Sequence, residues 1–331
     1  MVGHRPGRFP AVPENENRTL SPVAAFFGRR GWSPEAGTFG LSSPGARVGG
    51  GVKIALLLAP AMLIIGVLFV GGLYASFVQS LGYFPAIGQT TFSLDAYRTV
   101  LTDGGFLDSL LLTLYIAVVS TVVSTVLAVL VALALRRSSS RLSAVVFQVP
   151  ITVPHLVAAV GIALVVSQTG LGSRLAAALG LVGRPADFPA LLYDRYSIGV
   201  ILTYVWKETP FIALVVLAAL RGVASELEDV ARTLGANSLQ RFRYVVFPVI
   251  APGVVAASLV VFAFTFGSFE VPYLLGRDYP TILPVTAYNE YRSTELSDRP
   301  EAMAINVVIA LVTAVIAALY LRLGRRFGRG R

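Results

Sequence analysis

Long runs of hydrophobic residues alternate with short polar segments from residue 54 to residue 323. An apolar run of about 20 residues can cross the hydrocarbon core of a bilayer as a helix. Six runs meet this condition and predict six membrane-spanning helices, at Ile54–Gln79, Ser109–Leu135, Leu142–Ser167, Ser197–Leu220, Val249–Leu275 and Ala302–Leu323. Such a segment satisfies its backbone hydrogen bonds in lipid as a helix, so the pattern predicts an all-α integral membrane protein.

Four prolines lie within or beside these runs, at Pro60, Pro150, Pro154 and Pro210. Proline lacks an amide hydrogen and disturbs the helical turn before it, so we expect bends at these positions.

The ends of the chain differ from its middle. Residues 1–51 are rich in Gly, Pro, Ser and Arg and have no sustained apolar period, which predicts a disordered tail. Residues 52–326 form the predicted membrane domain, and residues 327–331 form a short basic tail.

Composition supports the same class. The chain has 331 residues, 55% of them hydrophobic and 14% charged, with a mean hydropathy of +0.72, values that place it with polytopic membrane proteins. The absence of cysteine excludes disulfides and thiolate metal sites, and two histidines argue against a multi-histidine site. We therefore expect neither a metal nor a cofactor.

The basic residues predict the orientation in the membrane. With the amino terminus in the cytoplasm, 19 of the 27 Lys and Arg residues lie in cytoplasmic segments, at 1–53, 136–141, 221–243 and 322–331. This asymmetry follows the positive-inside rule and predicts a multi-pass protein of the cell (inner) membrane with both termini cytoplasmic. It also explains the net charge of +9, so no nucleic-acid partner is expected.

The most polar stretch between two apolar runs is Ser225–Pro248, within a predicted cytoplasmic loop at residues 221–248. Ser225 and Glu228 have the spacing of a capping box at the start of a helix. A helical apolar stripe follows, formed by Leu227, Val230, Ala231 and Leu234.

Gly235 stands where this first helix would end. A second short helix would place Leu239, Phe242 and Val246 on one face, flanked by Arg241 and Arg243. Pro248 closes the segment before the next apolar run. One interpretation of the whole stretch is an ordinary amphipathic linker hairpin.

The pattern also resembles the EAA loop of permease subunits in binding-protein-dependent ABC importers. That motif has Glu-Ala-Ala, three residues, Gly, nine residues and Ile-x-Leu-Pro; here the matching positions are Asp229-Val230-Ala231, Gly235 and Val245-Val246-Phe247-Pro248. Every spacing holds, although Asp replaces Glu, Val replaces the first Ala, and Val and Phe replace Ile and Leu. The resemblance implies coupling to an ATPase through Glu228, Asp229, Ala231, Gly235, Arg241 and Pro248.

The same resemblance implies the partners: ABC ATPase subunits, a second permease subunit (a sister chain or another copy), an extracytoplasmic solute-binding protein and the surrounding membrane lipid. The chain contains no Walker A sequence G-x-x-x-x-G-K-[ST]. It is therefore not expected to be an enzyme, and ATP hydrolysis is expected on a partner subunit.

Charged residues inside apolar runs are candidates for a translocation path, because ionisable groups in lipid are costly unless they pair or face the interior. Lys207 and Glu208 precede Pro210 in the fourth run, and we expect a bent, partly opened segment lining the path there. The alternative is an ion pair that braces neighbouring helices. Glu270 could contact a cationic solute, pair with Lys207 or lie at the interface.

The sequence favours a small, polyamine-like solute only through resemblance. Ser268–Gly276, the later L-P-V-T-A-Y-N-E-Y and the R-P-E-A-M-A-I-N before the sixth run resemble the spermidine/putrescine-type branch of these permeases. The competing function is a secondary transporter driven by ions, using Lys207, Glu208, Glu270 or His155.

Two loops on the predicted external side have features of their own. The first, Leu81–Leu107, contains Ser93, which could cap a short helix, and the second, Gly276–Pro300, has the aromatic and polar mixture of a surface helix. Each could contact the external binding protein or anchor the chain at the interface.

Overall fold

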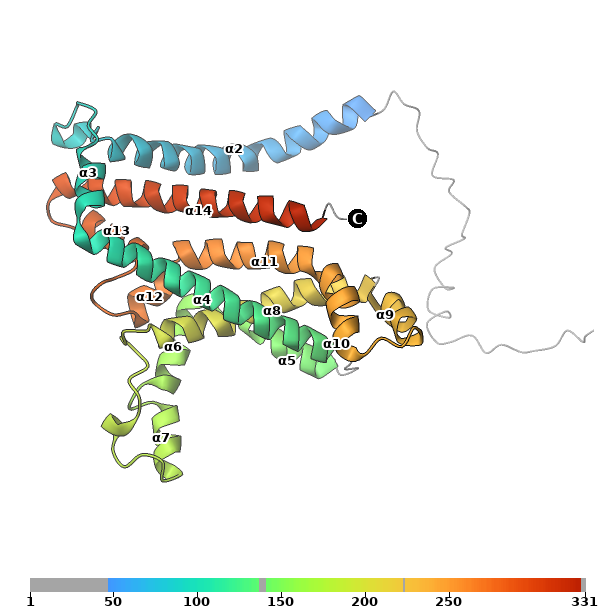
Figure 1. Ribbon diagram of the computed structural model, residues 1–331. Helices are drawn as coiled ribbons and strands as arrows, with labels where there is room; N and C mark the ends of the chain where they lie inside the picture. Colours follow the sequence, from blue (N-terminus) through green and yellow to red (C-terminus); the bar gives the residue numbers. More distant parts are fainter. Residues whose placement is uncertain (1–46, 137–140, 223, 329–331) are drawn as a thin grey trace, which may run out of the picture. The chain divides into compact units, whose positions relative to one another are not determined.

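A computed structural model of the chain describes the backbone of residues 47–136, 141–222 and 224–328 (Figure 1). The chain divides into two units, residues 1–64 and residues 65–331. Throughout the described ranges the regular elements are helices, as the hydrophobic pattern predicts. The predicted tails lie largely outside these ranges.

The described part of the first unit is the beginning of helix α2 (Arg47–Ser80), which continues into the second unit. The chain remains helical through Pro60. The large hydrophobic side chains from Ile54 to Ile64 are exposed, as expected for a surface that meets lipid or another protein subunit.

The second unit contains the remaining elements. They are the 3-10 helix η2 (Pro85–Ile87), α3 (Asp95–Thr102), α4 (Gly104–Leu135), α5 (Arg141–Thr152), α6 (His155–Val166), α7 (Leu171–Ala178), η3 (Pro185–Asp187), α8 (Ile198–Gly222), α9 (Ala224–Thr233), α10 (Ser238–Arg241), the π-helical turn η4 (Phe242–Val246), α11 (Phe247–Gly267), α12 (Glu270–Leu275), α13 (Leu283–Tyr291), η5 (Leu296–Asp298) and α14 (Arg299–Gly328).

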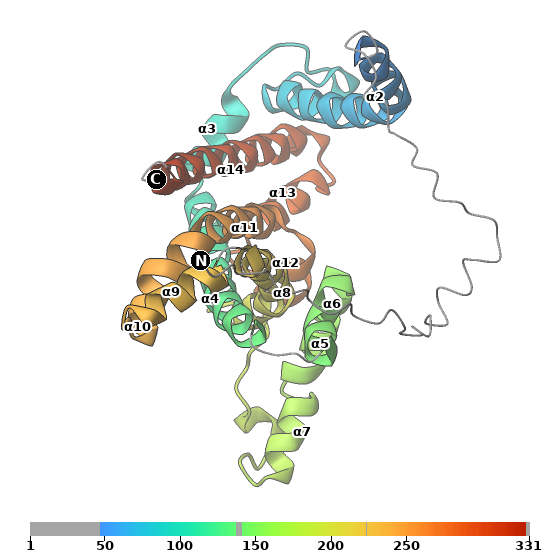
Figure 2. The same ribbon diagram turned by 90° about the vertical axis from the view of Figure 1, so that its right-hand side faces the viewer.

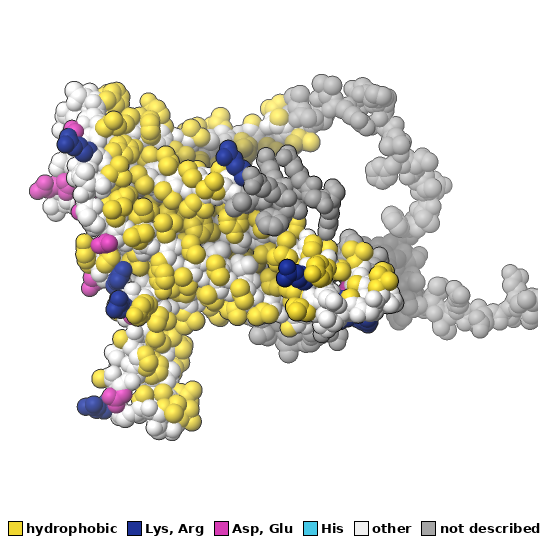
Figure 3. All heavy atoms as spheres, viewed as in Figure 1, with side chains coloured by type: hydrophobic (Ala, Val, Ile, Leu, Met, Phe, Trp, Pro, Cys, Tyr) yellow, Lys and Arg dark blue, Asp and Glu magenta, His cyan; other side chains and the backbone are white. Residues whose placement is uncertain are grey.

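Six stretches of the described residues are long and apolar enough to span a membrane, which confirms the predicted number. They are Ile54–Ser80, Gly104–Leu135, His155–Ala178, Ile198–Leu220, Ser238–Gly267 and Leu296–Arg322. On the face of the second unit shown in Figure 3, charged side chains lie near the ends of the helices and the middle is hydrophobic.

Two predicted boundaries are wrong. The third run is not one helix from Leu142 to Ser167, because the backbone leaves the helical conformation at Pro154 (ψ 145°) between α5 and α6. The fifth run does not continue to Leu275, because the chain is extended at Ser268 (ψ 137°) and α12 is a separate helix.

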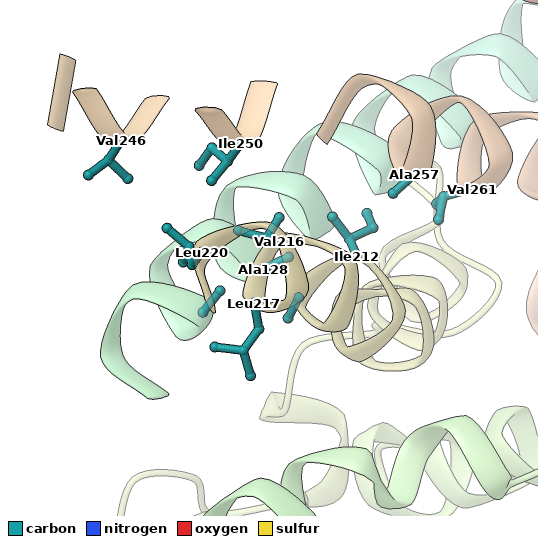
Figure 4. Packing of buried hydrophobic residues seen from close by; sticks show 11 residues of the cluster. Ala128, Ile212, Val216, Leu217, Leu220, Val246, Ile250, Ala257 and Val261 are labelled. Carbon is teal, nitrogen blue, oxygen red and sulfur yellow. The ribbon is translucent and has the colours of Figure 1, made fainter. Parts of the chain in front are cut away.

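The core of the second unit forms where α4, α8 and α11 pack together (Figure 1 and Figure 2). On α4, Ser120, Ser124, Ala128 and Ala132 recur every four residues and are completely buried. Small residues at this spacing allow two membrane helices to approach closely. Ile212, Val216 and Leu220 of α8 pack with Ala128 and Ala132, and Val246, Ile250 and Val261 join the same cluster (Figure 4).

Helix α13 packs against α14 and α4 rather than lying on the surface. The sequence predicts a surface helix here, but Leu283, Pro284, Val285 and Ala287 are buried. The amide of Leu283 donates to Oγ1 of the buried Thr113 on α4 at 2.9 Å. This bond satisfies a backbone donor that the first turn of a helix leaves free.

Candidate functional site

The predicted coupling segment folds as two short helices that lead into a long one. Helix α9 ends at Thr233, and Gly235 in the turn that follows has a left-handed φ of +82°. The amide of Ala236 donates to the carbonyl of Ala231 at 3.0 Å, the bond that closes a Schellman cap. The predicted role of Gly235 as a helix terminator is therefore confirmed.

The second part begins with a capping box that the sequence analysis missed. Asn237 Oδ1 accepts from the amide of Gln240, and Gln240 Oε1 accepts from the amide of Asn237, both at 2.9 Å. The Asn-x-x-Gln spacing was the available signal. Helix α10 is only four residues long and passes through the π-helical turn η4 directly into α11. As a result Val246 is buried while Leu239 is 73% exposed, so the predicted common face of Leu239, Phe242 and Val246 is not formed.

Glu228 lies at the base of the segment, against the end of α4. Its carboxylate accepts from Arg136 at 2.8 and 3.3 Å, and Nε of Arg241 lies 3.6 Å from Oε1. The side chains of Arg136, Glu228 and Arg241 are only 13–18% exposed. The capping box predicted between Ser225 and Glu228 depends on the side chain of Ser225, which lies outside the described part.

Two arginines in this network have further roles. Arg241 also donates to the carbonyl of Ala236 at 2.9 Å, which holds the turn after Gly235. Arg136 caps the end of α4, and nothing in its sequence position predicts a partner 92 residues away. A cavity of about 340 Å³ lies beside this network, lined in part by Arg136, Glu228 and Arg241.

The outer surface of the segment is apolar and exposed. Leu227, Val230 and Leu234 are 45%, 57% and 82% exposed, so the predicted stripe faces away from the rest of the second unit. Ala231 is partly buried, and Pro248 is exposed in the first turn of α11. Asp229 is 72% exposed and forms only a 3.6 Å pair with Arg232 on its own helix. The segment thus combines a braced base with an apolar outer face.

Lys207 and Glu208, inside α8, contact different parts of the broken third run. Lys207 is 5% exposed, and its Nζ donates to the carbonyl of Pro150 at 2.7 Å and to that of Val153. Glu208 Oε1 lies 3.0 Å from Nε2 of His155. The His155 ring packs on Phe264 with ring centroids 4.7 Å apart.

The alternative of an ion pair that braces neighbouring helices therefore holds in part: Lys207 and Glu208 do connect α8 to α5 and α6, but not by pairing with each other. Among the described residues Lys207 forms no ion pair with Glu208 or Glu270, since its ammonium contacts backbone carbonyls. Glu270 is exposed in the first turn of α12. Neither Glu208 nor Glu270 is therefore neutralised by Lys207 among the described contacts.

The opening predicted around Pro210 does not occur, because α8 is helical from Ile198 to Gly222. Thr209 Oγ1 donates to the carbonyl of Val205 at 2.6 Å in the turn where Pro210 removes a donor. Pro210 is buried and lines an apolar groove of about 430 Å³ between α4, α5 and α8. The interruption lies instead at Pro154, across from Lys207.

The external-loop residues are also placed. Helix α3 begins at Asp95, and its N-cap residue is Leu94. Ser93, one residue before the N-cap, accepts a hydrogen bond from the Asp95 amide through Oγ at 2.9 Å.

Within the described residues, no group of three His, Asp or Glu side chains is arranged to hold a metal ion.

A bundle of apolar helices with one amphipathic, exposed two-helix segment at one end defines a polytopic membrane protein. The model for the family described as binding-protein-dependent transport system inner membrane component matches residues 124–330. This match covers more than half of the chain, and the chain belongs to that family.

Similar proteins include the inner membrane ABC transporter permease protein YdcU of Escherichia coli, 34% identical over 128 residues, which are 39% of this chain and 38% of YdcU. The spermidine/putrescine transport system permease protein PotB of Haemophilus influenzae is 29% identical over 133 residues, covering 40% of this chain and 46% of PotB. The matches thus span less than half of the length of these relatives.

A solved structure has the same fold. The crystal structure of a bacterial ABC transporter involved in the import of the acidic polysaccharide alginate contains a chain with a TM-score of 0.68 and 19% identity. The match covers 85% of this chain and 99% of that one.

Proposed function

We propose that this chain is the permease subunit of an ABC importer, which forms the path for a small solute and is driven by a separate ATPase subunit. The observation that carries the proposal is the segment 224–248, whose outer apolar stripe is exposed while its base is braced against α4 by Glu228 and Arg136. Exposed apolar patches with polar surroundings are typical of protein interaction sites. A shift of this segment would be transmitted to α4 through the contact between Arg136 and Glu228, and to α11, into which the segment continues.

The partners follow from the same reasoning. The segment would dock on an ABC ATPase subunit in the cytoplasm, with both chain termini on that side. A second permease subunit, either a sister chain or another copy, would complete the path, and an extracytoplasmic binding protein would deliver the solute. The family description and the resemblance of residues 229–248 to the EAA loop support this arrangement.

We propose that the translocation path is lined by the face of α8 that carries Glu208 and by the region around Pro210, and that Glu270 lies at its external end. Glu270 is exposed and Glu208 is bound only to His155 among the described contacts, so both carboxylates could meet a cation. This favours a polyamine-like solute, which PotB is named for, although the alginate transporter of the same fold imports an acidic polysaccharide.

The test is uptake in proteoliposomes that contain the chain with its partner permease and ATPase subunits, with the extracytoplasmic binding protein supplied on the outside. We expect uptake of labelled spermidine or putrescine that requires ATP and the ATPase subunit. Uptake without the ATPase, abolished by a proton or sodium ionophore, would favour the secondary transporter and overturn the proposal. ATP-dependent uptake of sulfate or an oligosaccharide instead would retain the permease and reject the polyamine.

Docking is tested separately by Leu234→Ser with Leu239→Ser, which remove exposed apolar area and should weaken ATPase binding roughly tenfold. Thr233→Ala is the matched control, because Thr233 is exposed and its hydroxyl donates only to Val230 on the same helix. Equal affinity of all three proteins for the ATPase would place the docking surface elsewhere.

A further inference from the structure

The break between α5 and α6 leaves backbone carbonyls without helical donors. Helix α5 ends at Thr152 and α6 begins at His155. In a continuous helix the carbonyl of Pro150 would accept from the amide of residue 154, but Pro154 has no amide hydrogen. The amide of Val153 reaches the Pro150 carbonyl only at 3.4 Å. In the apolar part of a membrane, such a group needs another donor.

Lys207 supplies that donor from a different helix. Its Nζ lies 2.7 Å from the Pro150 carbonyl and also donates to the carbonyl of Val153, which lies within the break. The ammonium is buried, so water does not compete for it. A positive charge at the carboxyl end of a helix is also favoured by the helix dipole.

The neighbouring residue holds the other side of the break. Glu208 contacts Nε2 of His155, the first residue of α6, at 3.0 Å. Consecutive residues on a helix point about 100° apart, so Lys207 and Glu208 can reach two different elements. One turn of α8 thus contacts the end of α5 and the beginning of α6.

We propose that Lys207 is a positioning residue that holds the α5–α6 break open, occupying the hydrogen-bond position that Pro154 leaves empty, and that it is not a ligand of the transported solute. The proposal rests on the proposed function only for its transport readout. The break itself can be measured independently of any solute.

The experiment uses paired spin labels in the full chain, assembled with its partner subunits. The sequence has no cysteine, so Val145→Cys on α5 and Leu164→Cys on α6, both exposed positions, can be labelled without other changes. Pulsed electron paramagnetic resonance then reports the distance distribution across the break. It is measured for the parent, Lys207→Met, Pro154→Ala and the double variant.

We expect Lys207→Met to broaden the distance distribution and extend it to longer distances. The ratio of molecules with the α5–α6 break to molecules without it should fall roughly tenfold, the effect of losing one charge-assisted hydrogen bond. In the Pro154→Ala background the same change should have little further effect, because the amide of residue 154 can then bond to the Pro150 carbonyl. Lys207→Arg should retain most of the parent distribution, since a guanidinium can donate to both carbonyls.

Thr209→Val is the matched control, because Thr209 is buried on the same turn of α8 and its hydroxyl bonds only within that helix. An unchanged distribution in Lys207→Met would overturn the proposal, as would equal broadening with and without Pro154. A solute ligand would instead raise the half-saturation concentration for uptake in Lys207→Met and leave the distribution unchanged. If the parent complex transports nothing with ATP, the proposed function fails while the distance measurement still decides the role of Lys207.

Discussion

The carboxylate of Glu228 accepts hydrogen bonds from both terminal nitrogens of Arg136, at 2.8 and 3.3 Å. This contact joins α9 to the end of α4 across 92 residues of sequence. A bidentate arginine–carboxylate pair fixes orientation as well as distance. Glu228 therefore fixes the inner side of the segment against α4, while Leu227, Val230 and Leu234 on its outer side remain exposed.

Replacing Glu228 with Gln should lower the free energy of unfolding by roughly 1–3 kcal/mol, because Arg136 then loses a charged acceptor in a mostly buried position. Thermal unfolding of the purified chain measures the loss. The ATPase activity of the assembled complex should also become less dependent on solute.

The matched control for Glu228 is Asp229→Asn on the next residue. The Asp229–Arg232 pair is 3.6 Å long with side chains 72% and 66% exposed, so the change should stay within about 0.5 kcal/mol. Equal destabilisation by both variants would show that the Arg136–Glu228 pair contributes no more to stability than any single negative charge on α9.

Gly235→Ala should destabilise the turn after α9 by about 1 kcal/mol, and Gly235→Val by more, because residues with a Cβ disfavour a φ of +82°. A Cβ at this position would meet nothing within 4 Å, so the cost comes from the backbone alone. Membrane insertion should be unchanged while ATPase coupling falls. Gly235→Asn should be the mildest change, and coupling equal to that of the parent in Gly235→Val would contradict this account.

Thr113→Val should cost about 1–3 kcal/mol of stability, because it leaves the buried Leu283 amide at the start of α13 without an acceptor. The control is Thr203→Val, whose hydroxyl is buried but only donates to the carbonyl of Gly199 within α8. Chemical unfolding in detergent compares the two variants. A larger loss in the control would show that the bond between α4 and α13 is not important.

Glu290, on α13, should make stability depend on pH. Its pKa is raised above the ordinary carboxyl value by its partial burial and by the nearby charges of Asp298 and Asp103. A group with a raised folded-state pKa binds its proton more tightly in the folded protein, so stability is highest below the ordinary pKa and falls as pH rises through the raised one.

Glu290→Gln should therefore increase thermal stability at neutral pH and change it little in acid. Melting temperatures of the parent and the variant, measured from acid to neutral pH, give the difference in stability. A constant difference at every pH would exclude titration of Glu290 as its cause.

Much of the fold could be predicted because each membrane-spanning helix is specified by its own residues. A long apolar run satisfies its backbone in lipid as a helix, so the number of spans follows from run length, although the break at Pro154 shifts the third span to His155–Ala178. The same holds for Gly235, whose position after an amphipathic stripe predicts a left-handed helix end. These features depend on residues close in the sequence.

The tertiary structure alone decided which polar groups meet. Lys207 could have paired with Glu208, Glu270 or a solute, but packing of α8 against the broken third run gives it two backbone carbonyls. Glu228 similarly contacts Arg136 through packing rather than sequence proximity. A charge in an apolar surrounding takes whichever partner the neighbouring helices bring within reach, and that choice depends on contacts between distant segments that no local pattern contains.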